Sequence, residues 1–410
     1  MRRANVLVII LAGLLLLAAP LGLGAQTASS RLTPEQELGR KLFAEVELSL
    51  NRNQSCRSCH HPDAGFADPK NAAEPFARPV SEGSKPGSFG GRNAPSAAYA
   101  AFSPPFAWDP ATGRYRGGQF WDGRAKTLAE QAGGPPMNPV EMAMPSREVA
   151  GARLAARPDY VQAFAAVYGL DLATASPDAV FAAMTTAVAA YEASREVCAF
   201  TSKFDAVLAG RARFTRMEMM GYRFFLRAGC ANCHSVQPVR APDGGVWPPL
   251  FTDFSYHNVG APKNLLLETS APAPADLGLG GLPAIQAADP EGRQRGKFKA
   301  PSLRNVARTA PYGHNGVFRT LGEIVHFYST RDLLPVCPEG GAASSYPCWR
   351  APEVAENVNT ADMGRLRLCP MQERHIVAFL HTLTDGWTGE DMAAPGGGGR
   401  GRCGRMRRAF

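Results

Sequence analysis

Two copies of the pattern Cys-x-x-Cys-His carry the most specific chemistry in the chain. The copies CRSCH and CANCH contribute Cys56, Cys59, His60, Cys230, Cys233 and His234. In this pattern two thiols bond covalently to a c-type haem, and the adjacent imidazole binds the haem iron. The alternatives are a zinc site, which needs further paired ligands, and a redox dithiol, which needs no histidine at the next position. The sequence therefore predicts two covalently bound c-type haems, with His60 and His234 as iron ligands.

Each haem motif is preceded by a similar segment, LTPEQELGRKLF before the first and FTRMEMMGYRFF before the second. Gly39 and Gly221 occupy equivalent positions in these segments, and threonine and phenylalanine residues around them also correspond. Both segments begin with Thr-x-x-Gln or Thr-x-x-Glu, the capping box that starts a helix. We therefore expect one short amphipathic helix before each motif, in a chain that contains a duplicated haem-binding unit.

Further helical patterns lie between and after the motifs, whereas strand patterns are few and loops rich in Pro and Gly are long. The expected helices lie within residues 146–169, 176–194, 320–330 and 365–384. We expect a mainly α fold with long irregular loops and two helical haem domains. The N-terminal haem domain is expected at residues 28–195 and the C-terminal one at residues 196–390.

The two ends of the chain differ in composition from its body. Arg2 and Arg3 are followed by an apolar run and then by small residues before Gln26, a pattern typical of a cleaved export signal over residues 1–25. An uncleaved membrane anchor is the alternative. Residues 391–410 are rich in Gly and Arg and are expected to form a flexible basic tail. The export signal predicts a periplasmic protein.

The charge and the remaining cysteines bear on partners and on the redox compartment. The net charge of +8 is modest for 410 residues, and basic and aromatic residues are not interleaved, so we expect no nucleic-acid partner. A basic surface could still guide an acidic protein partner. Five of the nine cysteines lie outside the haem motifs. Cys337 and Cys348 could form a short-range disulfide in an oxidising compartment, and the odd remainder implies a free thiol, most simply Cys403.

Several further motifs surround the haem patterns in a fixed order: GRNAPS, FWDGRA, EQAGGPPMNPVEM and LRNVARTAPYGHNG. Together with the haem motifs they resemble the bacterial di-haem cytochrome c peroxidase family, including its MauG branch, over nearly all of the chain after the signal. The resemblance implies two cytochrome-c-like domains, with the active site and an electron relay near the interface between them.

On this resemblance, the stretch GGQFWDGRAKTLAEQAGGPPMNPVEM, residues 117–142, lies on the distal side of the first haem. Trp121 matches the tryptophan between the haems, and Pro135 matches the proline over the open iron face. Gln131 and Glu141 match the polar pair of the distal pocket. Splitting peroxide needs a group that takes a proton from one oxygen and returns it to the other, which a partly buried carboxylate such as Glu141 can do. Gln131 can orient peroxide by hydrogen bonds but cannot exchange protons.

Without the resemblance, the same side chains have ordinary structural interpretations. Glu141 would be a surface carboxylate at a helix end, Gln131 a helix cap and Trp121 an anchor in the core.

The positions of the histidines indicate which iron is open to peroxide. Apart from His60 and its neighbour His61, no histidine precedes His234. Donor-driven members of the family close the resting first haem with a loop histidine, and the corresponding stretch SEGSKPGSFGGRNAPS has none. We therefore expect the first iron to be open without prior reduction, as in the MauG branch.

The second haem is expected to have a tyrosine ligand. Tyr328 stands where donor-driven members of the family have a methionine ligand and the MauG branch has a tyrosine. A phenolate stabilises oxidised iron better than a thioether does, which favours sharing of oxidation between the two haems. The alternative ligands are His326, Met363 and Met371.

The resemblance also implies a calcium ion between the haems. Asn93, Thr309 and Pro311 match the residues that bind it, the last two through main-chain oxygens, and oxygen donors suit calcium. His314 lies in the motif PYGHNG, and we expect from it only hydrogen bonds to other residues of the site.

These expectations favour a periplasmic di-haem peroxidase of MauG type. Hydrogen peroxide would react at the N-terminal haem, and oxidising equivalents would pass through Trp121 to the C-terminal haem. The oxidised partner would be a small redox protein, such as a c-type cytochrome or a cupredoxin, or the side chains of a protein substrate. The alternative from another class is a di-haem electron carrier without peroxide turnover, in which both irons would have two protein ligands.

Overall fold

The computed structural model describes residues 31–240, 245–267, 274–338 and 347–389. The expected export signal and basic tail lie outside these residues. Within the described ranges, no helix is long and apolar enough to cross a membrane.

The fold is mainly α, as the sequence predicts. The helices are α1 (Pro34–Phe43), α2 (Cys56–Cys59), α3 (Pro69–Ala73), α4 (Leu128–Ala132), α5 (Gly134–Met137), α6 (Arg147–Ala155), α7 (Pro158–Tyr168), α8 (Pro177–Glu192), α9 (Lys203–Leu208), α10 (Arg216–Arg227), α11 (Pro283–Ala288), α12 (Leu321–Thr330) and α13 (Pro370–His381). Three antiparallel two-stranded ribbons pair β1 (Ala107–Asp109) with β2 (Arg114–Arg116), β3 (Val239–Arg240) with β4 (Val246–Trp247), and β5 (Tyr256–His257) with β6 (Phe298–Lys299).

Prolines set the ends of the helices that the sequence patterns predicted. The helical pattern over residues 146–169 forms two helices, α6 and α7, because Pro158 forces the residue before it out of helical geometry; Arg157 is extended, with φ −114° and ψ 110°. The pattern over residues 365–384 becomes helical only at Pro370, with Cys369 as the N-cap. The predicted helices over 176–194 and 320–330 are α8 and α12.

The two haem motifs follow equivalent helix crossings. α1 packs on α8, and α10 packs on α13, and both α1 and α10 begin with the predicted capping box. A Cβ atom at Gly39 would overlap the main-chain carbonyl of Ala187 in α8, and one at Gly221 would overlap the carbonyl of His375 in α13. The glycines therefore allow the same close approach of two helices in each half, which confirms the predicted repeat.

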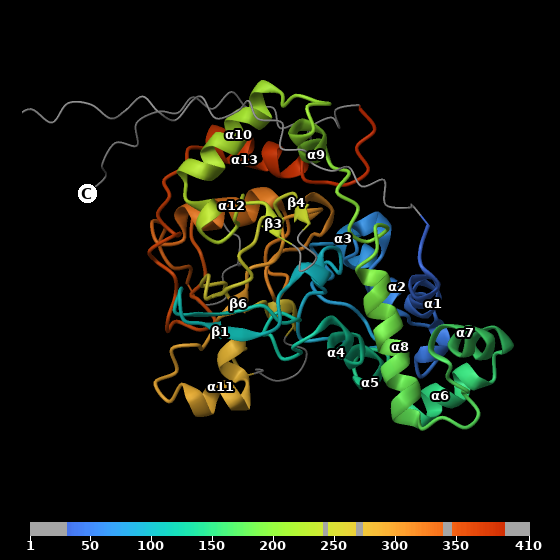
Figure 1. Cartoon of the computed structure of the whole chain (residues 1–410). Coiled ribbons are helices and arrows are strands. Elements are labelled where there is room, and N and C mark those ends of the chain that lie inside the picture. Colours follow the sequence, from blue (N-terminus) through green and yellow to red (C-terminus); the bar gives the residue numbers. More distant parts are fainter. Residues whose placement is uncertain (1–30, 241–244, 268–273, 339–346, 390–410) are drawn as a thin grey trace, which may run out of the picture.

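Two large hydrophobic clusters surround these crossings (Figure 1). The first joins α1, α6, α7 and α8, and the second joins α10, α12 and α13. Leu250 and Phe254, far beyond residue 195, pack in the first cluster. A small third cluster contains Tyr256, Leu279 and the α11 residue Ile285; Figure 1 shows α11 below α10, α12 and α13.

The cysteine predictions are confirmed in part. Cys337 and Cys348 form a disulfide, and Cys369 is also disulfide-bonded. Cys198 is a free, buried thiol. The prediction for Cys403 concerns a residue outside the described ranges.

Candidate functional site

One cavity of about 690 Å³ brings the two haem motifs together. This volume is within the range of roughly 300–1,000 Å³ that is usual for ligand and cofactor sites. Its lining includes every residue that the sequence predicts to hold haem or calcium or to act on peroxide. These are Cys56, Cys59, His60, Asn93, Trp121, Gln131, Pro135, Glu141, Cys230, Cys233, His234, Thr309, Pro311 and Tyr328.

The histidines of the two motifs are held in the same way. His60 Nδ1 lies 3.1 Å from the carbonyl oxygen of Phe66, and His234 Nδ1 lies 2.9 Å from that of Phe251. Because a carbonyl oxygen only accepts, each Nδ1 donates, and each Nε2 keeps its lone pair. Burial lowers the pKa of both imidazoles. A hydrogen bond from the second ring nitrogen is the usual way of orienting a metal-binding histidine, so both rings are suited to bind iron through Nε2.

The four thiols of the motifs are shielded from water, which disfavours the thiolate. Burial raises the pKa of Cys56, Cys59, Cys230 and Cys233 to about 12. Zinc binding and thiol–disulfide exchange both need thiolates. Within the described residues, no group of three or more His, Cys, Asp or Glu side chains could hold a metal ion. Within the described residues the motifs therefore lack the further paired ligands that a zinc site needs.

The stretch from residue 117 to 142 folds back on itself through two very short helices. Gln131 lies near the end of α4, Gly133 separates the helices, and Pro135 lies in the first turn of α5, where its missing N–H is not needed. After α5 the chain returns, and Met142 N donates to Pro135 O at 3.1 Å. Glu141, Gln131 and Pro135, all from this closed loop, line the same cavity.

The main chain of Glu141 is held by a hydrogen bond, and its side chain is partly buried. The amide of Ser84 donates to the carbonyl oxygen of Glu141 at 2.6 Å. Burial raises the pKa of the Glu141 carboxyl, while Arg124 and a hydrogen bond with Asn138 act in the opposite direction. Phe120, Arg124, Asn138 and Glu141 also line an outer hollow of about 260 Å³ that the exposed Glu130 borders. The carboxyl therefore stands between the large cavity and the protein surface.

Trp121 is linked to the residues expected to bind calcium. Its indole Nε1 donates to the carbonyl oxygen of Asn93 at 2.9 Å, and the Asn93 carboxamide donates to Pro79 O at 3.0 Å. Lys299 N donates to the Trp121 carbonyl at 2.8 Å. Thr309 lines the same cavity as Asn93, and its hydroxyl donates to Val306 O at 3.3 Å. Hydrogen bonds therefore fix Trp121 against Asn93 and Lys299, two other residues that line the cavity.

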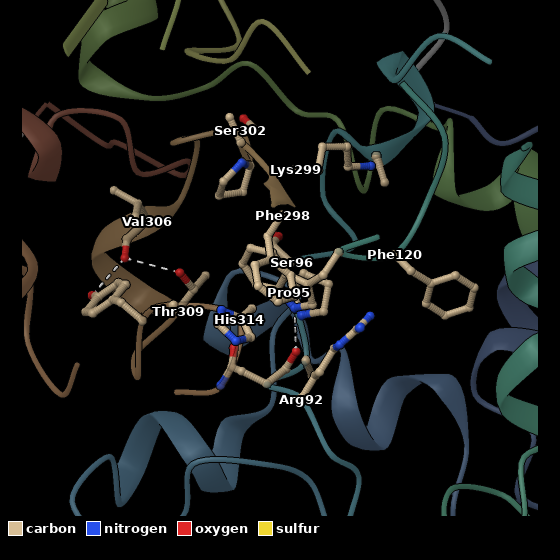
Figure 2. A pocket seen from close by; sticks show the side chains of 18 of the residues that line it. Arg92, Pro95, Ser96, Phe120, Phe298, Lys299, Ser302, Val306, Thr309 and His314 are labelled. Atoms are coloured by element: carbon tan, nitrogen blue, oxygen red, sulfur yellow. Dashed lines mark hydrogen bonds between the residues drawn. The ribbon is translucent and has the colours of Figure 1, made fainter. Parts of the chain in front are cut away.

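Charged side chains that the sequence analysis did not assign also line the cavity. Arg92 donates to Asp122 at 2.6 Å and to both oxygens of Asp276 at 2.6 and 2.8 Å. Figure 2 shows Arg92 beside His314, which stacks on Phe298 with 3.5 Å between ring centroids. The contacts of Arg92 thus join three segments that are separate in sequence, those of Arg92, Asp122 and Asp276.

Unsatisfied polar atoms indicate that a polar group occupies the cavity in the functional protein. Four buried atoms that line it have no hydrogen-bond partner in the described part of the chain: Ser81 Oγ, Glu192 Oε2, Arg304 Nη2 and His314 Nε2. Buried polar groups are nearly always hydrogen-bonded in native proteins. Burial also lowers the pKa of Lys299, on the same wall, to about 7. The residues present therefore fit haems, whose propionates would supply negatively charged acceptors.

Tyr328 lies on α12 and faces the second haem motif. Burial raises the pKa of its phenol, and Cys233 and Cys230 add to that rise, which places the hydroxyl near the two thiols. Of the alternative ligands, Met363 lines the cavity and His326 and Met371 do not. His326 Nδ1 instead pairs with Glu373 at 3.0 Å.

The sequence analysis missed Arg124, Glu192 and Arg304. Arg124 lies within the motif FWDGRA. Glu192 ends the long helix α8, and a carboxylate after the apolar run that follows Asp178 was a usable signal. Arg304 lies in the motif LRNVARTAPYGHNG, but its burial depends on contacts with Asp205 and Pro249 that are remote in sequence.

Comparisons of the sequence identify its relatives. A family model described as di-haem cytochrome c peroxidase matches residues 33–213. The methylamine utilization protein MauG of Paracoccus denitrificans is 43% identical over 356 residues, which cover 85% of this chain and 88% of that protein. The cytochrome c551 peroxidase of Nitrosomonas europaea is 32% identical over 299 residues, which cover 72% of this chain and 73% of that protein.

Solved structures give the same result for the fold. The crystal structure of the di-haem peroxidase BthA from Burkholderia thailandensis matches with a TM-score of 0.70 and 31% sequence identity, over 87% of each chain. A MauG-like protein associated with microbial copper homeostasis matches with a TM-score of 0.63 and 29% identity, over 87% of this chain and 91% of that one. The similarity extends over most of the chain and includes both haem motifs.

Proposed function

The chain belongs to the di-haem cytochrome c peroxidase family, and on that premise we propose that it is a periplasmic peroxidase of MauG type. It is an oxidoreductase that uses peroxide, and the family implies two c-type haems. The observation that carries the finer proposal is the single cavity lined by both haem motifs and by Trp121, Gln131, Pro135 and Glu141. We assign the N-terminal haem domain to residues 28–195 and the C-terminal one to residues 196–390.

Each half of the chain would hold one haem. Cys56, Cys59 and His60 would hold the first, and Cys230, Cys233 and His234 the second, with Tyr328 as its distal ligand. The haem irons would supply the binding and two-electron reduction of hydrogen peroxide to water. The side chain of Pro135 has no donor atom for an iron, and its carbonyl oxygen accepts from Met142 N, so it would leave the first haem open to peroxide.

Glu141 would handle the protons of the reaction. A carboxylate accepts the proton of the peroxide oxygen nearer the iron and, as the acid, returns it to the departing oxygen, which leaves as water. The burial that raises the pKa of Glu141 suits both steps, because it makes the carboxylate a stronger base than an exposed one. Gln131 would orient the peroxide by hydrogen bonds. The nearby Arg124 limits how far the pKa rises.

The two electrons consumed by peroxide must come from an external partner. Trp121, held by Asn93 and Lys299, would carry charge between the two halves, and the partner would be oxidised near the C-terminal haem. This partner would be a small redox protein, such as a c-type cytochrome or cupredoxin, or side chains of a protein substrate. We also propose a calcium ion bound by Asn93, Thr309 and Pro311, which all line the cavity and can offer oxygen donors.

Stopped-flow spectroscopy of the fully oxidised protein tests the proposal. We expect mixing with hydrogen peroxide to change the haem spectrum rapidly without any prior reduction, and candidate donors then to restore the starting spectrum. A protein that is inert to peroxide until it is half-reduced would be a donor-driven peroxidase. A protein that is inert in every redox state would be an electron carrier.

A further inference from the structure

Glu192 has a buried carboxyl that the proposed reaction does not use. It is the last residue of α8, is 4% exposed and lines the cavity shared by the haem motifs. Its Oε2 atom has no hydrogen-bond partner among the described residues. An apolar side chain would fill the same place at lower cost, because a carboxyl removed from water without a partner is unfavourable. The position therefore indicates a role toward the group that occupies the cavity.

The surroundings of Glu192 contain no opposing charge. Val188 and Tyr191, one turn or less before it on α8, belong to the first hydrophobic cluster. The titratable groups that interact with Glu192 are two thiols, Cys56 on α2 and Cys198 in the segment after α8. Helices α1, α4 and α6 pack on α8, but no charged group from them, in the described part of the chain, contributes to the pKa of Glu192.

The interaction with Cys56 locates the carboxyl relative to the first haem. Among charged groups, Glu192 has the largest effect on the Cys56 thiol. This thiol is the atom to which one edge of the haem is attached in the proposed assignment. The carboxyl therefore lies near the attached edge, and Glu141, which has a smaller effect on the same thiol, contributes less there.

We propose that Glu192 releases a proton when the haem attached through Cys56 is oxidised and takes one up when that haem is reduced. The proposal rests on the assignment of the first haem to CRSCH. Loss of one electron from the iron adds one positive charge to the site, and in a low-dielectric interior this charge favours the carboxylate. Ferrous haem and the carboxylic acid thus become ferric haem, the carboxylate, one proton and one electron, so charge is conserved.

The state of the carboxyl in the chain agrees with this role. Burial raises the pKa of Glu192 to about 8, so the group changes its protonation near neutral pH. The ferric haem should lower this pKa relative to the ferrous haem. At pH values between the Glu192 pKa with ferric haem and that with ferrous haem, the reduction potential falls as pH rises. The slope is up to about 59 mV per pH unit, which is a tenfold change in the equilibrium constant of a one-electron reaction.

Redox titrations of the holoprotein over several pH values test the proposal. We expect the potential of the first haem to fall with pH in a window around the Glu192 pKa. In Glu192→Gln, which keeps the shape but cannot ionise, this dependence should disappear in that window. The potential of the second haem serves as an internal control and should have the same pH dependence in both proteins. An unchanged slope at the first haem in Glu192→Gln would overturn the proposal.

Infrared difference spectra between oxidised and reduced protein give an independent test. The carboxylic acid C=O band should be lost on oxidation in the wild type, and this signal should be absent in Glu192→Gln. If Glu192→Gln fails to fold with both haems, Glu192→Asp is used; there the pH window should move, because the carboxyl is retracted by one methylene. An unmoved window would contradict the proposal. Neither measurement uses peroxide, so a failure of the proposed peroxidase activity would be recognised separately.

Discussion

Replacing Glu141 by glutamine tests the proposed proton transfer most directly. Glutamine keeps the size of the side chain and can keep its hydrogen bond with Asn138, but it cannot accept a proton. Loss of a general acid–base group lowers a rate by about 100-fold or more. We therefore expect Glu141→Gln to bind both haems and to react with peroxide at least about 100-fold more slowly in stopped-flow mixing.

The pH dependence gives the same prediction a second readout. The base must be ionised, and burial raises the Glu141 pKa above its usual value, so the wild-type rate should rise as pH increases through that raised pKa. In Glu141→Gln this rise should be absent. Glu130→Gln is the matched control, because Glu130 borders the same outer hollow but is exposed, and it should react at the wild-type rate. Wild-type kinetics in Glu141→Gln would refute the reasoning.

Three further changes have defined outcomes. Gly39→Ala should lower the free energy of unfolding by about 1–3 kcal/mol, because its Cβ meets a helix carbonyl, whereas Gly151→Ala, which has room in α6, should raise it by up to about 1 kcal/mol; equal effects in denaturant titrations would refute this crossing. Tyr328→Met should raise the potential of the second haem in a redox titration, because a neutral thioether replaces a phenolate, and an unchanged potential would exclude Tyr328 as the ligand. Replacing Cys337 and Cys348 by serine should cost about 3 kcal/mol for so short a loop, measured by thermal unfolding against the wild type, and an unchanged midpoint would show that the disulfide adds nothing.

Local patterns predicted those parts of the protein that local chemistry determines. The capping boxes before both haem motifs, the helices over 176–194 and 320–330 and the bond between Cys337 and Cys348 follow from residues close together in sequence, and the structure contains them. The split between α6 and α7 was readable from Pro158 but was missed, because the apolar pattern continues across it.

The charged lining of the cavity could not be predicted in the same way. Arg304 is buried because Asp205, about a hundred positions earlier, accepts from its guanidinium at 2.6 Å. Arg92 likewise acquires its place from Asp276, on a segment 184 positions away. Sequence patterns describe one segment at a time, whereas these side chains obtain their environment only when remote segments pack together.

The two halves of the chain are alike on the proximal side of each haem motif and differ on the distal side. In both halves a glycine lets two helices cross closely, and the motif histidine donates from Nδ1 to a phenylalanine carbonyl. The distal wall of the first half comes from the short helices α4 and α5 and the turn that carries Glu141, whereas α12 brings Tyr328 to the second motif. Duplication would thus supply two similar haem-binding units, and the loops between them would determine which haem reacts with peroxide. A reaction confined to one haem would follow from this asymmetry if, as proposed, Glu141 transfers protons and the Pro135 side chain leaves the first iron without a second protein ligand.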